Sequence, residues 1–168
     1  MKKNNKGFSY VELLLVLAII AIMTGIMALS MSLVGRTNVN KGCDNLNNAM
    51  NQARTTSMAR GRTNGQITIS CEGGKYYYYI GKPGTAESNG GKVKFASLPV
   101  KVSYVLHSDP GVLESLDEGE SISIRYDQST GAFGMASVGD YVDNIVLSNG
   151  DKMATIKCYI PTGKTEIE

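Results

Sequence analysis

Hydrophobic positions are most concentrated near the N-terminus of the chain. From Leu13 to Val34 there are 22 consecutive residues without a charged side chain. A helix rises about 1.5 Å per residue, so this run matches a bilayer core of roughly 30 Å, and a core helix of a soluble domain is rarely apolar on every face for so long. We therefore predict a membrane-spanning helix, with the basic Met1–Lys6 segment on the cytoplasmic side and the rest of the chain outside. A secreted protein with a long signal is the alternative.

A second helical pattern continues beyond the apolar run. Small and apolar residues recur at intervals of three and four, as on one face of an α-helix, at Val39, Cys43, Leu46, Met50, Ala53 and Ser57. We predict that residues 35–62 continue the helix and lay this stripe against a β-sheet. Asn38 would cap a new turn if the chain bends there, and Gly61 with the Thr63-Asn64-Gly65 cluster ends the helix.

After Gly65 apolar and polar residues alternate, which is typical of half-buried strands. Turns are predicted at Gly73-Gly74 and Asn149-Gly150, and strands at residues 67–71, 76–80, 92–96, 100–106, 121–126, 132–135, 143–148 and 152–160. Several short strands after one long helix indicate an α+β fold, with the helix packed on an antiparallel β-sheet. We expect two antiparallel sheets, or one folded-over sheet, in a β-rich globular domain over residues 63–168.

Charge and composition argue against several classes of function. The net charge of +2 depends on Lys2, Lys3 and Lys6, because the rest of the chain carries 14 basic and 15 acidic side chains. The sequence pI of 8.4 therefore does not indicate a nucleic-acid partner. His107 is the only imidazole and stands beside a loop, and neither a nucleophile elbow nor a phosphate-binding loop is present. We expect neither catalysis nor an obligatory cofactor.

Three charged clusters have more than one interpretation. Cations at a helix C-terminus are favoured by the helix dipole alone, so we do not expect nucleic-acid binding by Arg54, Arg60 and Arg62. One group of acids has three alternative interpretations, namely a solvated face, a calcium site and a docking surface for a basic neighbour. These acids are Asp109, Glu114, Asp117, Glu118 and Glu120. A second calcium candidate, which also lacks the dense alternating acids of a calcium loop, comprises Asp140, Asp143 and Asp151.

The three cysteines are Cys43, Cys71 and Cys158, without a CxxC pair. Outside the cytoplasm a Cys71–Cys158 disulfide is conceivable, because both residues occupy apolar strand positions. Cys43 belongs to the helical stripe and is expected to behave as a small buried hydrophobe. Since an odd number cannot pair within one chain, three free buried thiols are the alternative.

The position of Glu12 sets the apolar run apart from an ordinary secretion signal. Placing a carboxylate at membrane depth costs a free energy on the order of 2–3 kcal/mol, and ordinary secretion signals avoid an acid there. The alternative is that the acid lies near the helix end and reaches the membrane interface. The segment Lys6-Gly7-Phe8-Ser9-Tyr10-Val11-Glu12-Leu13-Leu14 resembles the class III signal of type IV prepilins. That pattern is a short basic leader, a Gly, a Phe, three further residues, a Glu and a long apolar helix.

The resemblance implies how the N-terminus is processed and used. Prepilin peptidase would cut between Gly7 and Phe8 and methylate the new amine of Phe8, so that residues 1–7 are a leader peptide and residues 8–34 a transmembrane and assembly helix. Glu12 would meet the Phe8 amine of a neighbouring subunit, so that each charge offsets the other's desolvation. The implied partners are prepilin peptidase, other pilin or pseudopilin subunits and the assembly platform of the inner membrane.

The C-terminal half is similar to the GspH/FimT class of minor pseudopilins. The similarity lies in the spacing of strands and glycines from Ile124 to Phe133 and from Ile145 to Ile160, and in the closing Pro161-Thr162-Gly163-Lys164. It implies a minor subunit of a type IV pilus, a type II secretion system or a competence pseudopilus. A major pilin is the first alternative; a membrane-anchored extracellular binding domain is the second. Many major pilins carry a proline in the apolar helix, which this chain lacks.

Overall fold

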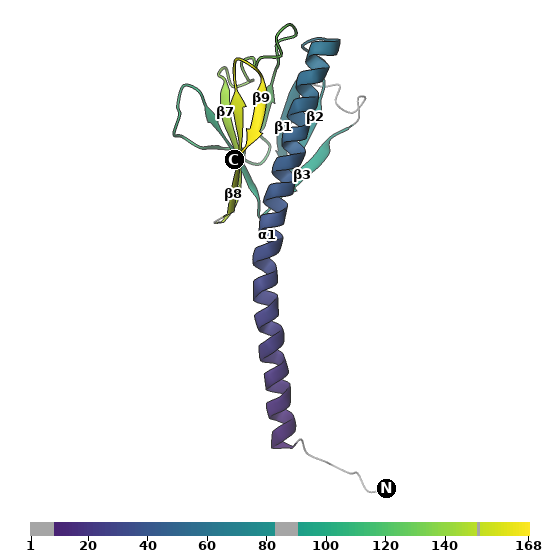
Figure 1. Ribbon diagram of the computed structural model, residues 1–168, viewed down its shortest axis with the longest axis vertical. Helices are drawn as coiled ribbons and strands as arrows, with labels where there is room; N and C mark the ends of the chain where they lie inside the picture. Colours follow the sequence, from purple (N-terminus) through teal and green to yellow (C-terminus); the bar gives the residue numbers. More distant parts are fainter. Residues whose placement is uncertain (1–8, 83–90, 151) are drawn as a thin grey trace. The chain divides into compact units, whose positions relative to one another are not determined.

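The computed structural model describes residues 9–82, 91–150 and 152–168, except for the side chains of residues 25–37. The chain separates into two compact units, residues 1–34 and residues 35–168. Helix α1 extends from Tyr10 to Arg60 and contributes to both (Figure 1). The second unit contains nine strands among its described residues.

The predicted helical stripe is confirmed in every member. All six of its side chains are at most 1% exposed, because a spacing of three and four places them on one face of α1. The helix ends at Arg60, and Gly61 follows with a φ of +97°, a value that glycine adopts without a steric penalty. The bend considered at Asn38 is absent, because this residue lies inside continuous α1.

The first sheet has the strand order β3-β2-β1-β6 and is antiparallel throughout. Its strands are β1 (Ile67–Glu72), β2 (Lys75–Ile80), β3 (Val93–Ser97) and β6 (Ser121–Ile124). Strands β1 and β2 are joined at Gly73 and Gly74, whose φ values of +60° and +66° form the predicted tight turn. Tyr76 and Tyr78 both contact the ring of Phe95 on the neighbouring strand β3.

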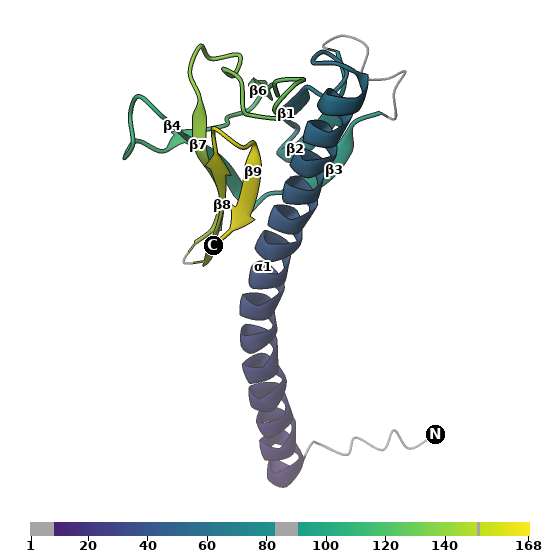
Figure 2. The same ribbon diagram turned by 45° about the horizontal axis from the view of Figure 1, so that its top comes forward.

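The second sheet has the order β5-β4-β7-β8-β9 and is also antiparallel (Figure 2). Its strands are β4 (Lys101–Leu106), β5 (Glu114–Ser115), β7 (Val142–Asn149), β8 (Lys152–Tyr159) and β9 (Lys164–Ile167). Along β7 and β8, Ile145, Leu147 and Ile156 point into the core and are at most 1% exposed.

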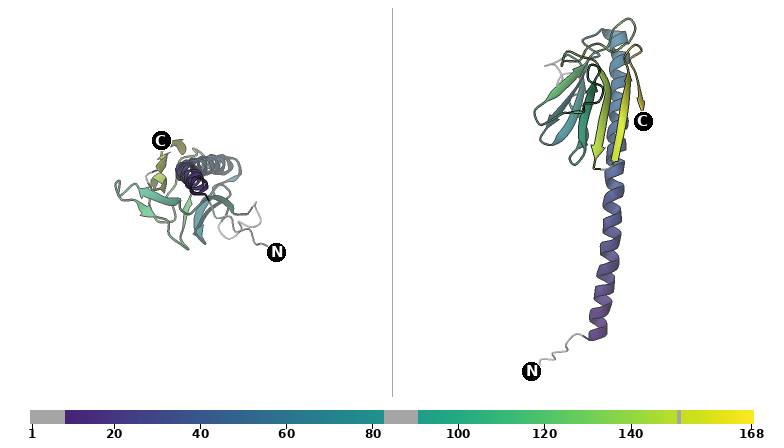
Figure 3. Two further views of the ribbon diagram at one scale, coloured as in Figure 1. Left: turned by 90° about the horizontal axis from the view of Figure 1, so that it is seen from below. Right: turned by 90° about the vertical axis from the view of Figure 1, so that its left-hand side faces the viewer.

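The helix of the second unit joins the two sheets through a shared core (Figure 3). A Cβ at Gly42 would lie 3.0 Å from Leu147 of β7 and 3.2 Å from the Phe95 carbonyl oxygen of β3, so α1 approaches both sheets closely at this residue. The Thr165 hydroxyl on β9 hydrogen-bonds the Asn47 side chain of α1. The result is the α+β, pilin-like arrangement of a helix packed on antiparallel sheets.

Three details of the strand prediction were wrong. Residues 132–135 form no strand, because only Phe133 makes a bridge, to Tyr126. The β7–β8 turn lies one residue later than predicted, since Asn149 pairs with Lys152. The two short strands β5 and β9 were not predicted. Both are largely exposed, so they lack the apolar alternation by which strands are recognised.

Candidate functional site

The start of α1 places Glu12 in the first turn of the helix. The Ser9 carbonyl accepts hydrogen bonds from the backbone N–H groups of Glu12 and Leu13, at 3.0 and 3.1 Å, so Ser9 is the N-cap. Ser9 and Glu12 have the spacing of a capping box, and the helix dipole favours a negative charge at this end. Helix geometry therefore gives Glu12 one stabilising role before any partner subunit is considered.

Every large apolar side chain from Tyr10 to Met23 is exposed. Their exposed fractions lie between 45% and 75%, and they surround the helix on all sides. Thr24 adds no unsatisfied polar group, because its hydroxyl donates to the backbone carbonyls of Ile20 and Ala21 at 2.9 and 3.0 Å. A surface of this composition requires an apolar environment.

Part of the predicted N-terminal site lies outside the described residues. This applies to Gly7 and Phe8, and to the side chains of residues 25–34, which complete the predicted membrane span. Among the described residues, no helix is long and apolar enough to cross a membrane.

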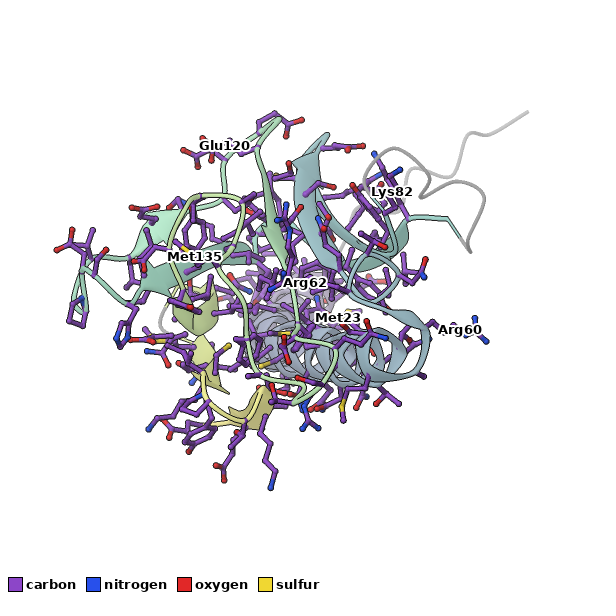
Figure 4. All side chains as sticks on the ribbon, turned by 90° about the horizontal axis from the view of Figure 1, so that it is seen from above. Met23, Arg60, Arg62, Lys82, Glu120 and Met135 are labelled. Carbon is purple, nitrogen blue, oxygen red and sulfur yellow. The ribbon has the colours of Figure 1, made fainter. Side chains whose placement is uncertain are left out.

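In the second unit, Arg54 ties the helix to two loops. Its Nε atom donates to the Gly131 carbonyl at 3.1 Å. Gly163, with a φ of +63°, packs so closely that a Cβ there would lie 1.7 Å from the Gly131 oxygen and 3.1 Å from Arg54 Nε. Arg54 therefore has a structural role, whereas Arg60 is exposed at the end of α1 and projects outward in Figure 4.

The acidic residues before β6 are partly used within the fold. Glu118 accepts hydrogen bonds from the backbone N–H groups of Gly73 and Gly74, at 2.5 and 3.0 Å. These bonds, that of Gly74 first, lower the pKa of Glu118 below its ordinary value. Glu118 therefore stays ionised and anchors the loop to the β1–β2 turn.

Asp140 and Asp143, two of the other acidic candidates, also have partners within the fold. Hydrogen bonds from Ser108 and from the Tyr141 N–H lower the pKa of Asp140. Asp143 lies 3.0 Å from His107 Nδ1, on an exposed imidazole. Asp151, the third member of the calcium candidate, is outside the described residues. In the part of the chain that the structure describes, no three His, Cys, Asp or Glu side chains gather as metal ligands.

The cysteines are free thiols in the structure, so the Cys71–Cys158 disulfide is not formed. The two residues lie in different sheets, Cys71 on β1 and Cys158 on β8. The Cys71 thiol contacts the Glu118 carboxylate at 3.8 Å, whereas the Cys158 thiol contacts the Ile156 carbonyl at 4.0 Å. Burial raises the pKa of Cys158 to about 12 and that of Cys43 to about 11.

Comparison with known proteins assigns the N-terminal segment. Residues 2–28 match the prokaryotic N-terminal methylation motif. This motif indicates a type IV pilin-like protein. It implies processing by prepilin peptidase, anchoring in the inner membrane before assembly, and assembly with pilin subunits, which are structural and not enzymatic. No curated protein and no solved structure matches the chain.

Sequence reasoning missed the contacts that hold the second unit together. Arg54 was interpreted through the helix dipole, although its partner is the Gly131 carbonyl, 77 positions away in sequence. Glu118 was grouped with the other acids, although it binds the Gly73-Gly74 turn. For Glu118 a signal did exist, because consecutive glycines with positive φ expose adjacent N–H groups that suit a carboxylate.

Proposed function

We propose that this protein is a minor pilin or pseudopilin that is assembled into a filament through its N-terminal helix. Prepilin peptidase cleaves between Gly7 and Phe8 and methylates the Phe8 amine. The mature chain spans the inner membrane once, with its N-terminus cytoplasmic and the β-rich domain outside. The observation that carries the proposal is an acid in the first turn of a helix whose large apolar side chains from Tyr10 to Met23 are all exposed, within a matched methylation motif.

Glu12 acts in assembly by pairing with the Phe8 amine of a neighbouring subunit. The apolar side chains beside it lose their contact with water when lipid or another helix covers them. A carboxylate in that setting is costly unless it is paired, and removal of one partner of a buried pair costs about 3–5 kcal/mol. The pair would therefore fix the relative height of adjacent subunits as well as contribute to their association.

The subunit class is proposed from the C-terminal half and from the composition of α1. The β7–β8 hairpin is followed by a turn at Thr162 and Gly163 that leads into Lys164, as in the GspH/FimT class that the C-terminal half resembles. No proline interrupts α1, which favours a minor subunit over a major pilin. A membrane-anchored binding domain would share the β-rich unit but would need no cleavage.

The first experiment is mass spectrometry of the N-terminus in cells with and without prepilin peptidase. The proposal expects a chain that begins with methylated Phe8 and an intact Met1-containing chain when the peptidase is absent. An unprocessed chain in both strains, or cleavage within the apolar run, would refute the filament role and leave an anchored or secreted domain.

Variants at Glu12 then separate assembly from helix capping. Glu12→Gln keeps a capping-box side chain but removes the charge, so incorporation into sheared filaments should fall as strongly as in Glu12→Ala, while cleavage continues. Glu114→Gln, a change at an exposed acid of the second unit, is the matched control and should assemble normally. If Glu12→Gln assembles like the wild-type chain, the charge pair is wrong.

A further inference from the structure

A cavity opens between the two sheets at the β1–β2 turn. Its volume is about 200 Å³, below the roughly 300–1,000 Å³ of typical small-molecule sites. The apolar walls come from both sheets and from the loops that follow β3 and β5, with Tyr76, Leu98, Val102 and Leu116. A space of this size and composition suits one small charged group on an apolar stem.

The free charges in the lining are one anion and one cation. Glu118 is already engaged, because each of its carboxylate oxygens accepts a hydrogen bond from the Gly73-Gly74 turn. The Asp117 carboxylate and the Lys101 ammonium also line the cavity, and neither makes an ion pair with a residue that the structure describes. A cavity with one free charge of each sign is complementary to a zwitterion.

The cavity lies at the end of the second unit that holds its first residues. A Cβ at Gly42 would lie 3.0 Å from Leu147 and 3.6 Å from the Ala96 side chain. Leu147 pairs with Val102 of the cavity wall. Ala96 in turn pairs with Tyr76, on the opposite wall. Both walls therefore stand at the level of Gly42, near the start of the unit.

This end of the unit is tethered closely to the apolar run. Val39 is buried in the core of the second unit, and the uncharged run ends at Val34. The step of five residues between them spans at most about 18 Å, even for a fully extended chain. With the apolar run in the membrane, as the proposed function requires, the cavity is held near the membrane surface.

Two exposed apolar side chains flank the cavity. Leu98 forms part of its wall and is 61% exposed, and Met153 is 64% exposed. Met153 lies in one row with Lys101, because Ser148 pairs with both residues. Adjacent strands are about 4.8 Å apart, so the backbone of Met153 lies roughly 10 Å from that of Lys101. Exposed apolar side chains beside a charged cavity suit insertion into a membrane interface.

We propose that this cavity binds the headgroup of one membrane lipid, a phosphatidylethanolamine. The ammonium group lies against Asp117, the phosphate lies against Lys101, and the acyl chains pass Leu98 toward the bilayer. A primary ammonium donates hydrogen bonds to a carboxylate, whereas phosphatidylcholine has no such donor and phosphatidylglycerol has no cation.

The lipid contact deepens the proposed function, on which it rests for the position of the apolar run in the membrane. It holds the second unit at the membrane surface until the subunit enters a filament. A single copy of the chain is sufficient for it, so it suits a subunit that is present in small numbers.

Lipid binding by the purified full-length chain in detergent tests the headgroup contact. Dihexanoyl phosphatidylethanolamine, phosphatidylcholine and phosphatidylglycerol are titrated separately, and bound lipid is counted by native mass spectrometry. Phosphatidylethanolamine should bind about tenfold more tightly than the other two, because each of them lacks the hydrogen bond to the charged carboxylate. Equal affinities for the three lipids would overturn the proposal. Glycerophosphoethanolamine, which carries the headgroup without acyl chains, should bind more weakly, and equal binding would overturn the membrane as the source.

Variants of the two free charges separate the parts of the headgroup. Asp117→Asn should weaken the binding of phosphatidylethanolamine about tenfold and abolish its preference over phosphatidylcholine. Lys101→Gln should weaken all three lipids by about fivefold, because they share the phosphate. Asp109→Asn, a change at an exposed acid outside the cavity, is the matched control and should bind like the wild-type chain. An unchanged lipid preference in Asp117→Asn would overturn the ammonium site.

A spin label shows whether this end of the unit reaches the membrane. Leu98→Cys is labelled with a nitroxide in the full-length chain, in vesicles of phosphatidylethanolamine and phosphatidylglycerol; the native thiols are buried. Arg60→Cys is the matched control, because Arg60 follows Gly42 by 18 residues of α1, or about 27 Å. The label at position 98 should collide mainly with lipid-soluble oxygen, and that at position 60 with a water-soluble nickel complex. Equal accessibilities would overturn the membrane contact.

The lipid tests and the processing test fail independently. Normal cleavage after Gly7 and a normal Glu12 effect, together with failed lipid tests, would leave the filament role standing without the headgroup site. An unprocessed N-terminus refutes the filament role whatever the lipid measurements show.

Discussion

Replacement of Gly163 by alanine should destabilise the second unit far more than the same change at a matched turn glycine. Gly163 has a φ of +63°, a conformation that costs an L-residue roughly 1–2 kcal/mol. A Cβ there would lie 1.7 Å from the Gly131 oxygen, so the two loops must separate. Separation breaks the Arg54–Gly131 hydrogen bond, and a bond to a charged group contributes about 1.5–3 kcal/mol. The expected total is about 2.5–5 kcal/mol.

Gly150→Ala is the matched control for this prediction. Gly150 has nearly the same φ, +61°, but nothing lies within 4 Å of its would-be Cβ, so only the backbone cost of roughly 1–2 kcal/mol applies. Urea unfolding of the full-length chain in detergent, followed by the near-ultraviolet circular dichroism of the tyrosines, gives both free energies. If the two variants unfold within about 0.5 kcal/mol of each other, the close contact of Gly163 with Gly131 does not hold the loops together.

Two further predictions concern titration and thiol chemistry. Hydrogen bonds from Ser129 and Thr130 lower the pKa of Asp127 from 3.8 to about 2, so its contribution to stability is present above pH 3.8 and is lost as the pH falls toward 2. The urea midpoint of the wild-type chain should therefore fall more steeply between pH 4 and 2 than that of Asp127→Asn, and parallel curves would contradict this. The buried thiols should resist iodoacetamide at pH 8 in the folded chain and take three labels after unfolding without reductant. A single label would show that two of the cysteines, such as Cys71 and Cys158, had formed a disulfide.

The sequence predicted those elements whose apolar residues follow one strict period. The α1 stripe, from Val39 to Ser57, and the alternation of Ile67, Ile69 and Cys71 each identify one buried face, and all these residues are buried. The alternation of apolar residues does not identify a strand that is short and exposed. Strand β9, Lys164–Ile167, is such a case, and its pairing with β8 fixes its position.

The candidate site divides in the same way. The N-terminal motif was recognised because its residues are adjacent in sequence and their spacing is set by the helix start. The cavity was not predicted, because its walls come from separate strands and a connecting loop. Tyr76 and Val102, for example, are brought together only when the two sheets meet. The sequence identified Asp117 and Glu118 as acids but could not show that one is engaged by a glycine turn and the other is free.

The exposed side chains of residues 10–23 and the buried core of residues 35–168 impose different requirements on the chain. The core is complete within the second unit, so its fold needs no partner to bury apolar residues such as Leu46, Ile69 and Ile156. In α1 before residue 24, each large apolar side chain gains about 1.5–3 kcal/mol only when something outside the chain covers it. Lipid and a neighbouring helix both meet that need, but in the proposed filament role it is the Phe8 amine of a neighbouring subunit that offers a fixed positive charge to Glu12. The charge at this position should therefore determine the transfer from membrane to filament, and a Glu12→Gln chain should accumulate in the membrane after normal cleavage.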